Sequence, residues 1–417
     1  MSGQEPRPTG PSLTELVTER RIVVCCGSGG VGKTTTAAAF ALEAARRGRR
    51  ACVITIDPAR RLANSLGLDS LTNVPAPIPG PWPGELYAMM LDPKGTFDDL
   101  VHRYAESDEQ AEGILSNRIY RSLTGALSGT QEYMATEKLH ELVETHAFDL
   151  VVVDTPPSRN ALDFLDAPRR LTHFLGNRLF QVLMAPTRAS LRVVGVAAHA
   201  LLRTLSKVAG ADIVQDAVTF FQAFAGMEEG FRERATRVQA LLTDPATSFV
   251  LVASPRSDSI AEAMHFAGKL DAVGMRTDAL IVNRVHPRFA TAELLARLPA
   301  PPPGEAGAAL AALEENLVRY AAINDREDRE VDSLVAVVDP APVVRVPTLG
   351  SDVHDLTGLE EIAGLLFASP GNPRPAGPEG PEAGPEAGPG PGPEAGPEAG
   401  SEGRAEPGSE GRAEPAP

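Results

Sequence analysis

A short segment near the start of the chain carries the residue types and the spacing needed to hold a phosphate. Gly27, Gly32, Lys33 and Thr34 satisfy the pattern G-x-x-x-x-G-K-[ST], between an apolar run that begins at Ile22 and a helical pattern. The glycines allow backbone N–H groups to close around a phosphate at the positive end of the helix. Lys33 is the predicted cation for the β- and γ-phosphates, and the Thr34 hydroxyl is the predicted Mg²⁺ ligand.

This loop predicts a site for ATP and Mg²⁺. A glycine-rich turn without a ligand is the alternative, but a chance match to the pattern is rare in a chain with only five lysines among 417 residues. The predicted nucleotide-binding residues of the loop are Gly27, Ser28, Gly29, Gly30, Val31, Gly32, Lys33, Thr34 and Thr35.

Asp57 is the predicted catalytic residue, together with Lys33. It directly follows the apolar run Ala51–Ile56, where its carboxylate can accept a proton from an attacking water or orient it. A turn or helix-capping aspartate before Pro58 is an equally open interpretation.

Asp154 ends a second apolar run, Leu150–Val153, and is predicted to reach Mg²⁺ through water. A turn aspartate at the end of a strand is the alternative. Because Pro156 and Pro157 cannot donate a backbone hydrogen bond, we expect a loop rather than an immediate helix after this aspartate.

Apolar runs of strand length recur along the chain, and helical patterns fill most of the intervals between them. This alternation predicts an α/β fold, a P-loop NTPase with a doubly wound, mostly parallel sheet and ligands at the carboxyl ends of its strands. A long helical stretch, about 161–242, is predicted to form an inserted helical subdomain. The predicted strands are Ile22–Cys26, Ala51–Ile56, Leu86–Leu91, Leu150–Val153, Phe249–Ala253, Leu280–Val282 and Val343–Val346.

The two ends of the chain differ in composition from the rest. Residues 1–11 form a polar lead, 12–368 the predicted ATPase domain, and 371–417 a Gly/Pro/Glu repeat tail that is expected to be disordered. The tail carries nine Glu and three Arg, so it accounts for six of the sixteen net negative charges. The remaining charge is only moderately acidic, which argues against a nucleic-acid partner.

Composition also bounds the cellular setting. The sequence shows no secretory signal pattern, and its apolar passages are shorter than the roughly 20 residues of a membrane span. Cys25, Cys26 and Cys52 form no disulfide framework and lie in predicted strands, where we expect them to be buried. A cytoplasmic protein is predicted, with peripheral membrane association left open.

Five segments, read in order, resemble the deviant-Walker ATPases of the arsenite-efflux (anion-transporting) and tail-anchored-protein-targeting family. They are GSGGVGKTT, TIDPARRLANSLG, VVVDTPPSRNALDFL, IVNRV and VPTLGSDVHDLTGL, within residues 20–366. The resemblance implies a nucleotide-dependent ATPase that works as a dimer. Abundant Ala, Gly and Pro, with 5 Lys against 34 Arg, is a composition associated with GC-rich bacterial genomes, so a bacterial member is expected.

The resemblance also assigns roles to individual residues. Asp57 matches the switch I aspartate of the family and Asp154 the switch II aspartate. Asn283 matches an asparagine that contacts adenine, and Pro347 lies near the base. The segment Gly129–Glu132 resembles a loosened form of a family dimer-contact motif.

Two departures from the family pattern concern charge and metal. Family members carry a signature lysine one residue after the first loop glycine, which reaches the phosphates of the partner subunit; this chain has Ser28 there. A C-x-x-C zinc clamp is expected after IVNRV, but no cysteine follows, so no zinc site is expected. The cysteines of the arsenite site are also missing.

These observations support three functional interpretations. The first is an ATP-driven targeting or chaperone factor that holds a hydrophobic client helix or membrane protein, with the 161–242 insertion as the groove; its apolar residues equally suit plain core packing. The second is the ATPase subunit of an arsenite-type anion efflux system. The third is a weakly hydrolysing regulatory subunit, paired with a lysine-bearing paralogue in a heterodimer instead of a homodimer.

Overall fold

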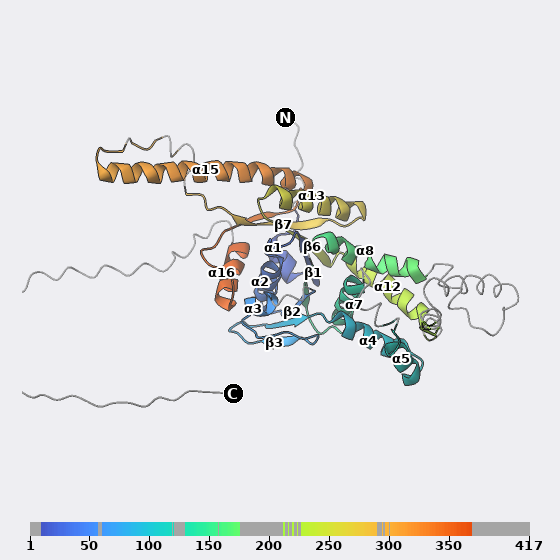
Figure 1. Ribbon diagram of the computed structural model, residues 1–417. Helices are drawn as coiled ribbons and strands as arrows, with labels where there is room; N and C mark the ends of the chain where they lie inside the picture. Colours follow the sequence, from blue (N-terminus) through green and yellow to red (C-terminus); the bar gives the residue numbers. More distant parts are fainter. Residues whose placement is uncertain are drawn as a thin grey trace, which may run out of the picture. The chain divides into compact units, whose positions relative to one another are not determined.

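The computed structural model describes residues 10–56, 61–118, 120, 130–156, 158–175, 212, 216, 219–220, 223, 227–289, 294, 297–299 and 301–368. Their strands form one eight-stranded sheet in the order β3-β4-β2-β5-β1-β6-β7-β8 (Figure 1). All neighbouring pairs are parallel except β3 and β4. The strands are β1 Ile22–Gly27, β2 Arg50–Thr55, β3 Ala76–Ile78, β4 Glu85–Met90, β5 Leu150–Asp154, β6 Thr247–Ala253, β7 Thr277–Val285 and β8 Val343–Pro347.

The central strands are buried on both faces. Every residue of β1, β5 and β6 is buried, as expected of parallel strands covered by helices on both sides. Two apolar clusters, one on each face, fill the space between sheet and helices. The predicted α/β fold with a mostly parallel, doubly wound sheet is confirmed.

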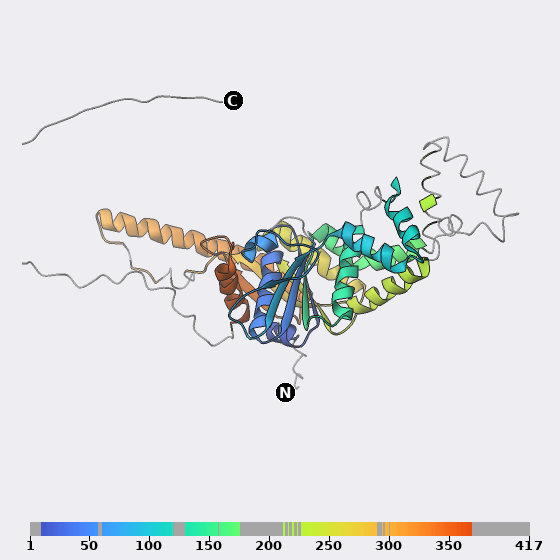
Figure 2. The same ribbon diagram turned by 90° about the horizontal axis from the view of Figure 1, so that it is seen from below.

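Two groups of helices cover the sheet (Figures 1 and 2). One face packs against α1, α2, α3 and α16, and the other against α7, α8, α13 and the second half of α15. The helices are α1 Leu13–Thr18, α2 Lys33–Arg46, α3 Arg61–Ser65, α4 Pro93–Tyr104, α5 Asp108–Leu115, α7 Thr130–Glu144, α8 Ser158–Leu175, α12 Glu228–Leu242, α13 Ser257–Ala272, α15 Glu305–Val338 and α16 Leu356–Phe367. None of the helices described here is both long and apolar enough to cross a bilayer.

Two details of the strands differ from the sequence-based expectations. The short antiparallel edge strand β3 was not expected, because three residues with a proline among them give no strand signal. Strand β7 is longer at both ends than the predicted Leu280–Val282. As expected, no helix follows Asp154 immediately, since α8 begins at Ser158. Prolines before a helix are tolerated because the N–H groups of the first turn need no helical partner.

Several predicted segments lie wholly or mostly outside the described residues. These are the repeat tail, most of the polar lead and the middle of the 161–242 insertion, of which α8 and α12 form the described ends. The division into a lead, an ATPase domain with its insertion and a tail therefore stays a prediction.

The three cysteines are fully buried in the sheet. Burial raises the pKa of the Cys26 and Cys52 thiols to about 12 and the pKa of Cys25 well above its ordinary value.

Since only the thiolate reacts, we expect iodoacetamide at about pH 8 to modify none of the three cysteines in the folded protein and all of them in denaturant. The unfolded thiols ionise from roughly pH 8.5, so stability should also fall as the pH rises above that value. Mass spectrometry of the alkylated protein checks the first expectation, and modification of the folded protein would contradict it.

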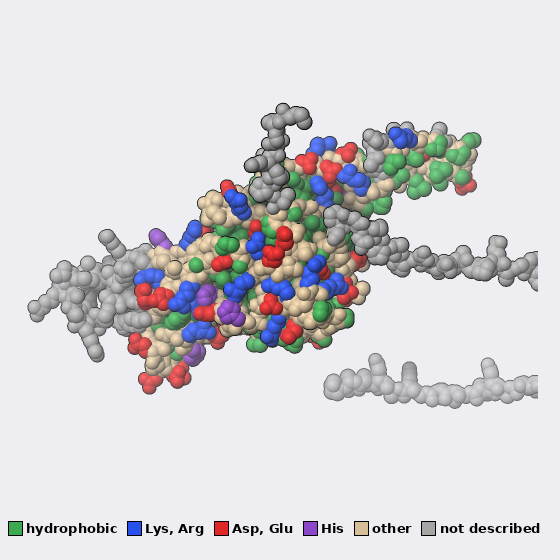
Figure 3. All heavy atoms as spheres, turned by 180° about the vertical axis from the view of Figure 1, so that it is seen from behind, with side chains coloured by type: hydrophobic (Ala, Val, Ile, Leu, Met, Phe, Trp, Pro, Cys, Tyr) green, Lys and Arg blue, Asp and Glu red, His purple; other side chains and the backbone are tan. Residues whose placement is uncertain are grey.

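Helix α15 carries an exposed apolar surface. Its first half extends away from the sheet, and hydrophobic side chains gather along that half (Figures 1 and 3). Eight of the ten large exposed apolar side chains among the described residues lie between Phe289 and Ile323. Phe289 packs edge-on against Tyr320, with ring centroids 5.2 Å apart, while Leu313 is 60% exposed. A helix that faced only water would carry polar residues there.

Candidate functional site

The glycine-rich loop lies between β1 and α2, at the carboxyl edge of the parallel sheet. Gly32 caps α2 with a φ of 97°, a left-handed conformation that favours glycine, and directs the start of the helix at the loop. A Cβ atom on Gly32 would lie 2.2 Å from Nδ2 of Asn283, so the position also requires glycine for lack of space. The loop therefore combines a helix N-terminus with a backbone free of side chains.

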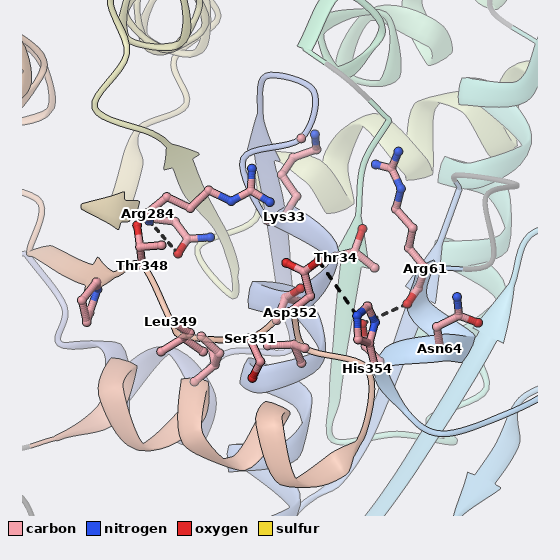
Figure 4. A pocket seen from close by; sticks show the side chains of 18 of the residues that line it. Lys33, Thr34, Arg61, Asn64, Arg284, Thr348, Leu349, Ser351, Asp352 and His354 are labelled. Carbon is pink, nitrogen blue, oxygen red and sulfur yellow. Dashed lines mark hydrogen bonds and ion pairs between the residues drawn. The ribbon is translucent and has the colours of Figure 1, made fainter. Parts of the chain in front are cut away.

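Lys33 is turned into this loop. Its side chain is buried, and Nζ donates a hydrogen bond to the Ser28 carbonyl oxygen at 2.8 Å. The ammonium group thus lies against the loop backbone at Ser28, where the phosphates of a bound nucleotide would lie. Figure 4 shows Lys33 and Thr34 on the same side of the cavity described below.

Thr34 and Asp154 meet at the ends of neighbouring strands. β1 and β5 pair in parallel with Cys25 opposite Asp154, and this register brings the aspartate beside the loop. Oδ2 of Asp154 accepts hydrogen bonds from the hydroxyls of Thr34 at 2.7 Å and Thr55 at 2.8 Å. A hydroxyl and a carboxylate oxygen side by side form the hard oxygen donor set that Mg²⁺ prefers, so these residues fit the ion.

Asn283 contacts the loop from β7. Its Nδ2 donates to the Val31 carbonyl oxygen at 2.8 Å, and its Oδ1 accepts from the Arg284 backbone N–H at 2.9 Å. An amide side chain offers two donor hydrogens and two acceptor lone pairs, so each group of Asn283 retains capacity for a base edge. Asn283, which the resemblance matches to an adenine-contacting asparagine, therefore lies against the loop, although it is 252 positions from Val31 in the sequence.

Lys33, Thr34 and Asn283 line one cavity of about 470 Å³ (Figure 4). Its lining includes loop residues, Asn283 and Pro347, and the segment after β8, where Nε2 of His354 lies 4.0 Å from Oδ2 of Asp352. Sequence reasoning took only Pro347 from this segment and missed several residues. The other cavity residues are Arg61, Asn64, Ser65, Thr155, Arg284, Thr348, Leu349, Ser351, Asp352, Val353, His354 and Ile362. All of these residues except Ile362 lie in the quoted segments TIDPARRLANSLG, VVVDTPPSRNALDFL, IVNRV and VPTLGSDVHDLTGL, which were the signal for them.

Ser28 lines a second cavity, of about 560 Å³, which shares Gly30, Arg284 and Thr348 with the first. The residue is only 6% exposed, and its Oγ lies 3.0 Å from Oγ of Ser259 on α13. Ser259 Oγ also accepts from the Ser254 backbone N–H at 3.0 Å. Ser28, at the position where the family resemblance predicts a lysine, thus forms a small, hydrogen-bonded contact between the loop and α13.

Asp57 and Gly129 lie outside the described residues. The predicted catalytic role of Asp57 therefore stays a prediction. The structure brings Lys33, Thr34, Asp154, Asn283 and Pro347 together around one edge of the sheet.

Comparison with known proteins adds a family to this geometry. Residues 20–292, well over half of the chain, match the family described as Anion-transporting ATPase. The chain is 25% identical to ATPase get3 of Aspergillus terreus over 66% of its length and 76% of that protein. It is 26% identical to ATPase GET3 of Malassezia globosa, over 86% of the chain and 94% of that protein. It is 30% identical to the uncharacterized protein SCO2128 of Streptomyces coelicolor, over 66% of the chain and 64% of that protein. The phosphate loop and Asp154 both lie within the matched residues 20–292. The chain therefore belongs to the anion-transporting ATPase family.

Proposed function

We propose that this protein binds and hydrolyses Mg-ATP in the cytoplasm as a dimer, and that its nucleotide state controls the binding of a hydrophobic client or membrane partner. The observation that carries the proposal is the contact set around the 470 Å³ cavity, where the loop, Asp154 and Asn283 converge. When bound, Mg²⁺ would neutralise charge on the phosphate oxygens. Thr34 and Asp154 are the residues that would hold it, the latter through water.

The residues of the chain have separate tasks in this proposal. Lys33 and the loop N–H groups bind the phosphates, and the start of α2 favours their negative charge. Asn283 and Pro347 hold the base. Asp57 accepts a proton from the attacking water or orients it.

A contact between the site and α15 supports the coupling to a partner. Glu327 of α15 accepts the backbone N–H of His286 at 3.0 Å and pairs with its Nδ1 at 2.5 Å. Asn324 donates to the His286 carbonyl oxygen at 2.9 Å. Since His286 follows Asn283 by three residues, a shift of the base-binding residues would move α15. A hydrophobic partner would bind the exposed apolar side chains on the first half of that helix.

The buried contact of Ser28 favours low activity of the isolated chain. Charge gathers on the γ-phosphate in the transition state, and an oriented cation is worth orders of magnitude in rate where water is excluded. Ser28 provides none, so a lysine-bearing paralogue in a heterodimer is the partner we favour. An anion-efflux role is less well supported, because all three cysteines are buried and offer no accessible thiol ligands for arsenite.

Turnover of the pure protein over a concentration series tests the proposal. We expect low ATPase activity for the isolated chain, a partial increase on Ser28→Lys and a larger stimulation by the paralogue. The 560 Å³ cavity beside Ser28 leaves room for the longer side chain. Ser28→Ala is the matched control, because it removes the contact with Ser259 without adding charge. Vigorous hydrolysis by a homodimer, unchanged by Ser28→Lys, would contradict the heterodimer, and absence of nucleotide binding would contradict the whole proposal.

A further inference from the structure

Arg284 has an unusual backbone conformation for its position. It follows Asn283 at the carboxyl end of β7, where the pairing with β8 shifts register between Asn283 and Val285. Its φ is 61°, in the left-handed region that favours glycine, and among the described non-glycine residues only His146 shares a positive φ. A large side chain in this conformation is less stable than glycine would be. Such a conformation at the edge of a ligand cavity suggests that the side chain has a task there.

The Arg284 side chain is placed between the two cavities beside the loop. It lines the 470 Å³ cavity together with Lys33 and the 560 Å³ cavity together with Ser28, and Gly30 also lines both. Figure 4 shows the side chain extending toward the phosphate loop. Asn283 holds its backbone at a defined position, because the same amide bonds the Arg284 N–H and the Val31 carbonyl of the loop.

The charge of Arg284 is not used within the described part of the chain. Neighbouring arginines are ion-paired: Arg256 with Asp258 at 3.0 Å, and Arg288 with Asp328 at 2.5 Å. The guanidinium of Arg284 makes no ion pair or hydrogen bond with any described residue, and only its backbone N–H is bonded. A guanidinium presents several donors in a planar fork, a geometry that matches phosphate oxygens.

We propose that Arg284 binds the phosphate chain of the nucleotide, from the side of the loop that faces the second cavity. It adds a cation to the binding of the nucleotide and does not replace the cation that a partner subunit would supply for hydrolysis. The inference rests on the proposed nucleotide site and assigns it a residue that the loop pattern does not contain. The left-handed backbone conformation of Arg284 is locally unfavourable, but it directs the long side chain from the end of β7 toward the loop.

The decisive variant is Arg284→Gly, because glycine relieves the backbone strain while it removes the guanidinium. We expect an unchanged or higher melting temperature of the ligand-free protein, with an affinity for Mg-ATP and Mg-ADP lower by about 10- to 100-fold, the scale of a lost hydrogen bond to a charged group. Arg284→Lys should restore part of the affinity. Isothermal titration of ATP, ADP and adenosine separates a phosphate contact from a base contact, since adenosine binding should not change.

His146→Gly is the matched control, because it relieves a left-handed residue at φ 50° that lines neither cavity. It should leave nucleotide affinity unaltered. If Arg284→Gly failed to fold, Arg284→Asn, which tolerates the same backbone conformation, would replace it. Wild-type affinity in the glycine variant, or an equal loss for adenosine, would overturn the inference while leaving the proposed function intact. No nucleotide binding by the wild-type protein would overturn both.

Discussion

Replacement of Lys33 by alanine should abolish nucleotide binding or weaken it by roughly 100-fold or more. Removing one partner of a buried ion pair costs about 3–5 kcal/mol, because the remaining charge is left without a counter-ion. Lys33 is buried, with its ammonium at the Ser28 carbonyl, so no water-exposed cation would replace it on the inner side of the loop. Isothermal titration with Mg-ATP measures the loss.

Two further variants make this result specific. Lys33→Met keeps most of the side-chain volume and should show the same loss, which would exclude a simple packing defect. Lys269→Ala removes an exposed lysine from α13 and should bind as the wild-type protein does. A Lys33→Ala variant that binds Mg-ATP with wild-type affinity would contradict the assignment of the loop.

Replacement of Asp57 by asparagine should preserve nucleotide binding and slow hydrolysis by about 100-fold or more, the scale of a lost general base. The amide is close in shape to the carboxylate but cannot accept the proton of the attacking water. Single-turnover hydrolysis at saturating Mg-ATP measures the chemical step, and a parallel titration measures binding.

Asp154→Asn is the informative comparison for that variant. Asp154 contacts the Thr34 hydroxyl, so the loss of its charge should weaken the dependence of nucleotide binding on Mg²⁺. Asp69→Asn, at an exposed position after α3, is the neutral control. An equal loss of binding in the Asp57 and Asp154 variants would show that Asp57 is structural or a metal ligand.

Local pattern was sufficient for the loop and for most of the sheet. The glycines and Lys33 act over eight consecutive residues, and continuous apolar runs identify buried parallel strands without any tertiary information. Strand boundaries were less accurate, because β7 extends through Thr277 and Arg284, whose polar side chains interrupt the apolar run. β3 was not predicted, because it is a strand through its pairing with β4 and not through its own composition.

The amino-acid sequence alone determined which residues are predicted to bind phosphate and metal, since that prediction rests on residue types at short spacing. Tertiary structure alone decided which distant residues reach them. The register of β1 against β5 places Asp154 on Thr34, and the order β1-β6-β7 places Asn283 on Val31. It also turned Ser28 toward Ser259 and left Arg284 facing the loop, because a side chain's direction depends on backbone dihedrals and neighbours that no local pattern encodes.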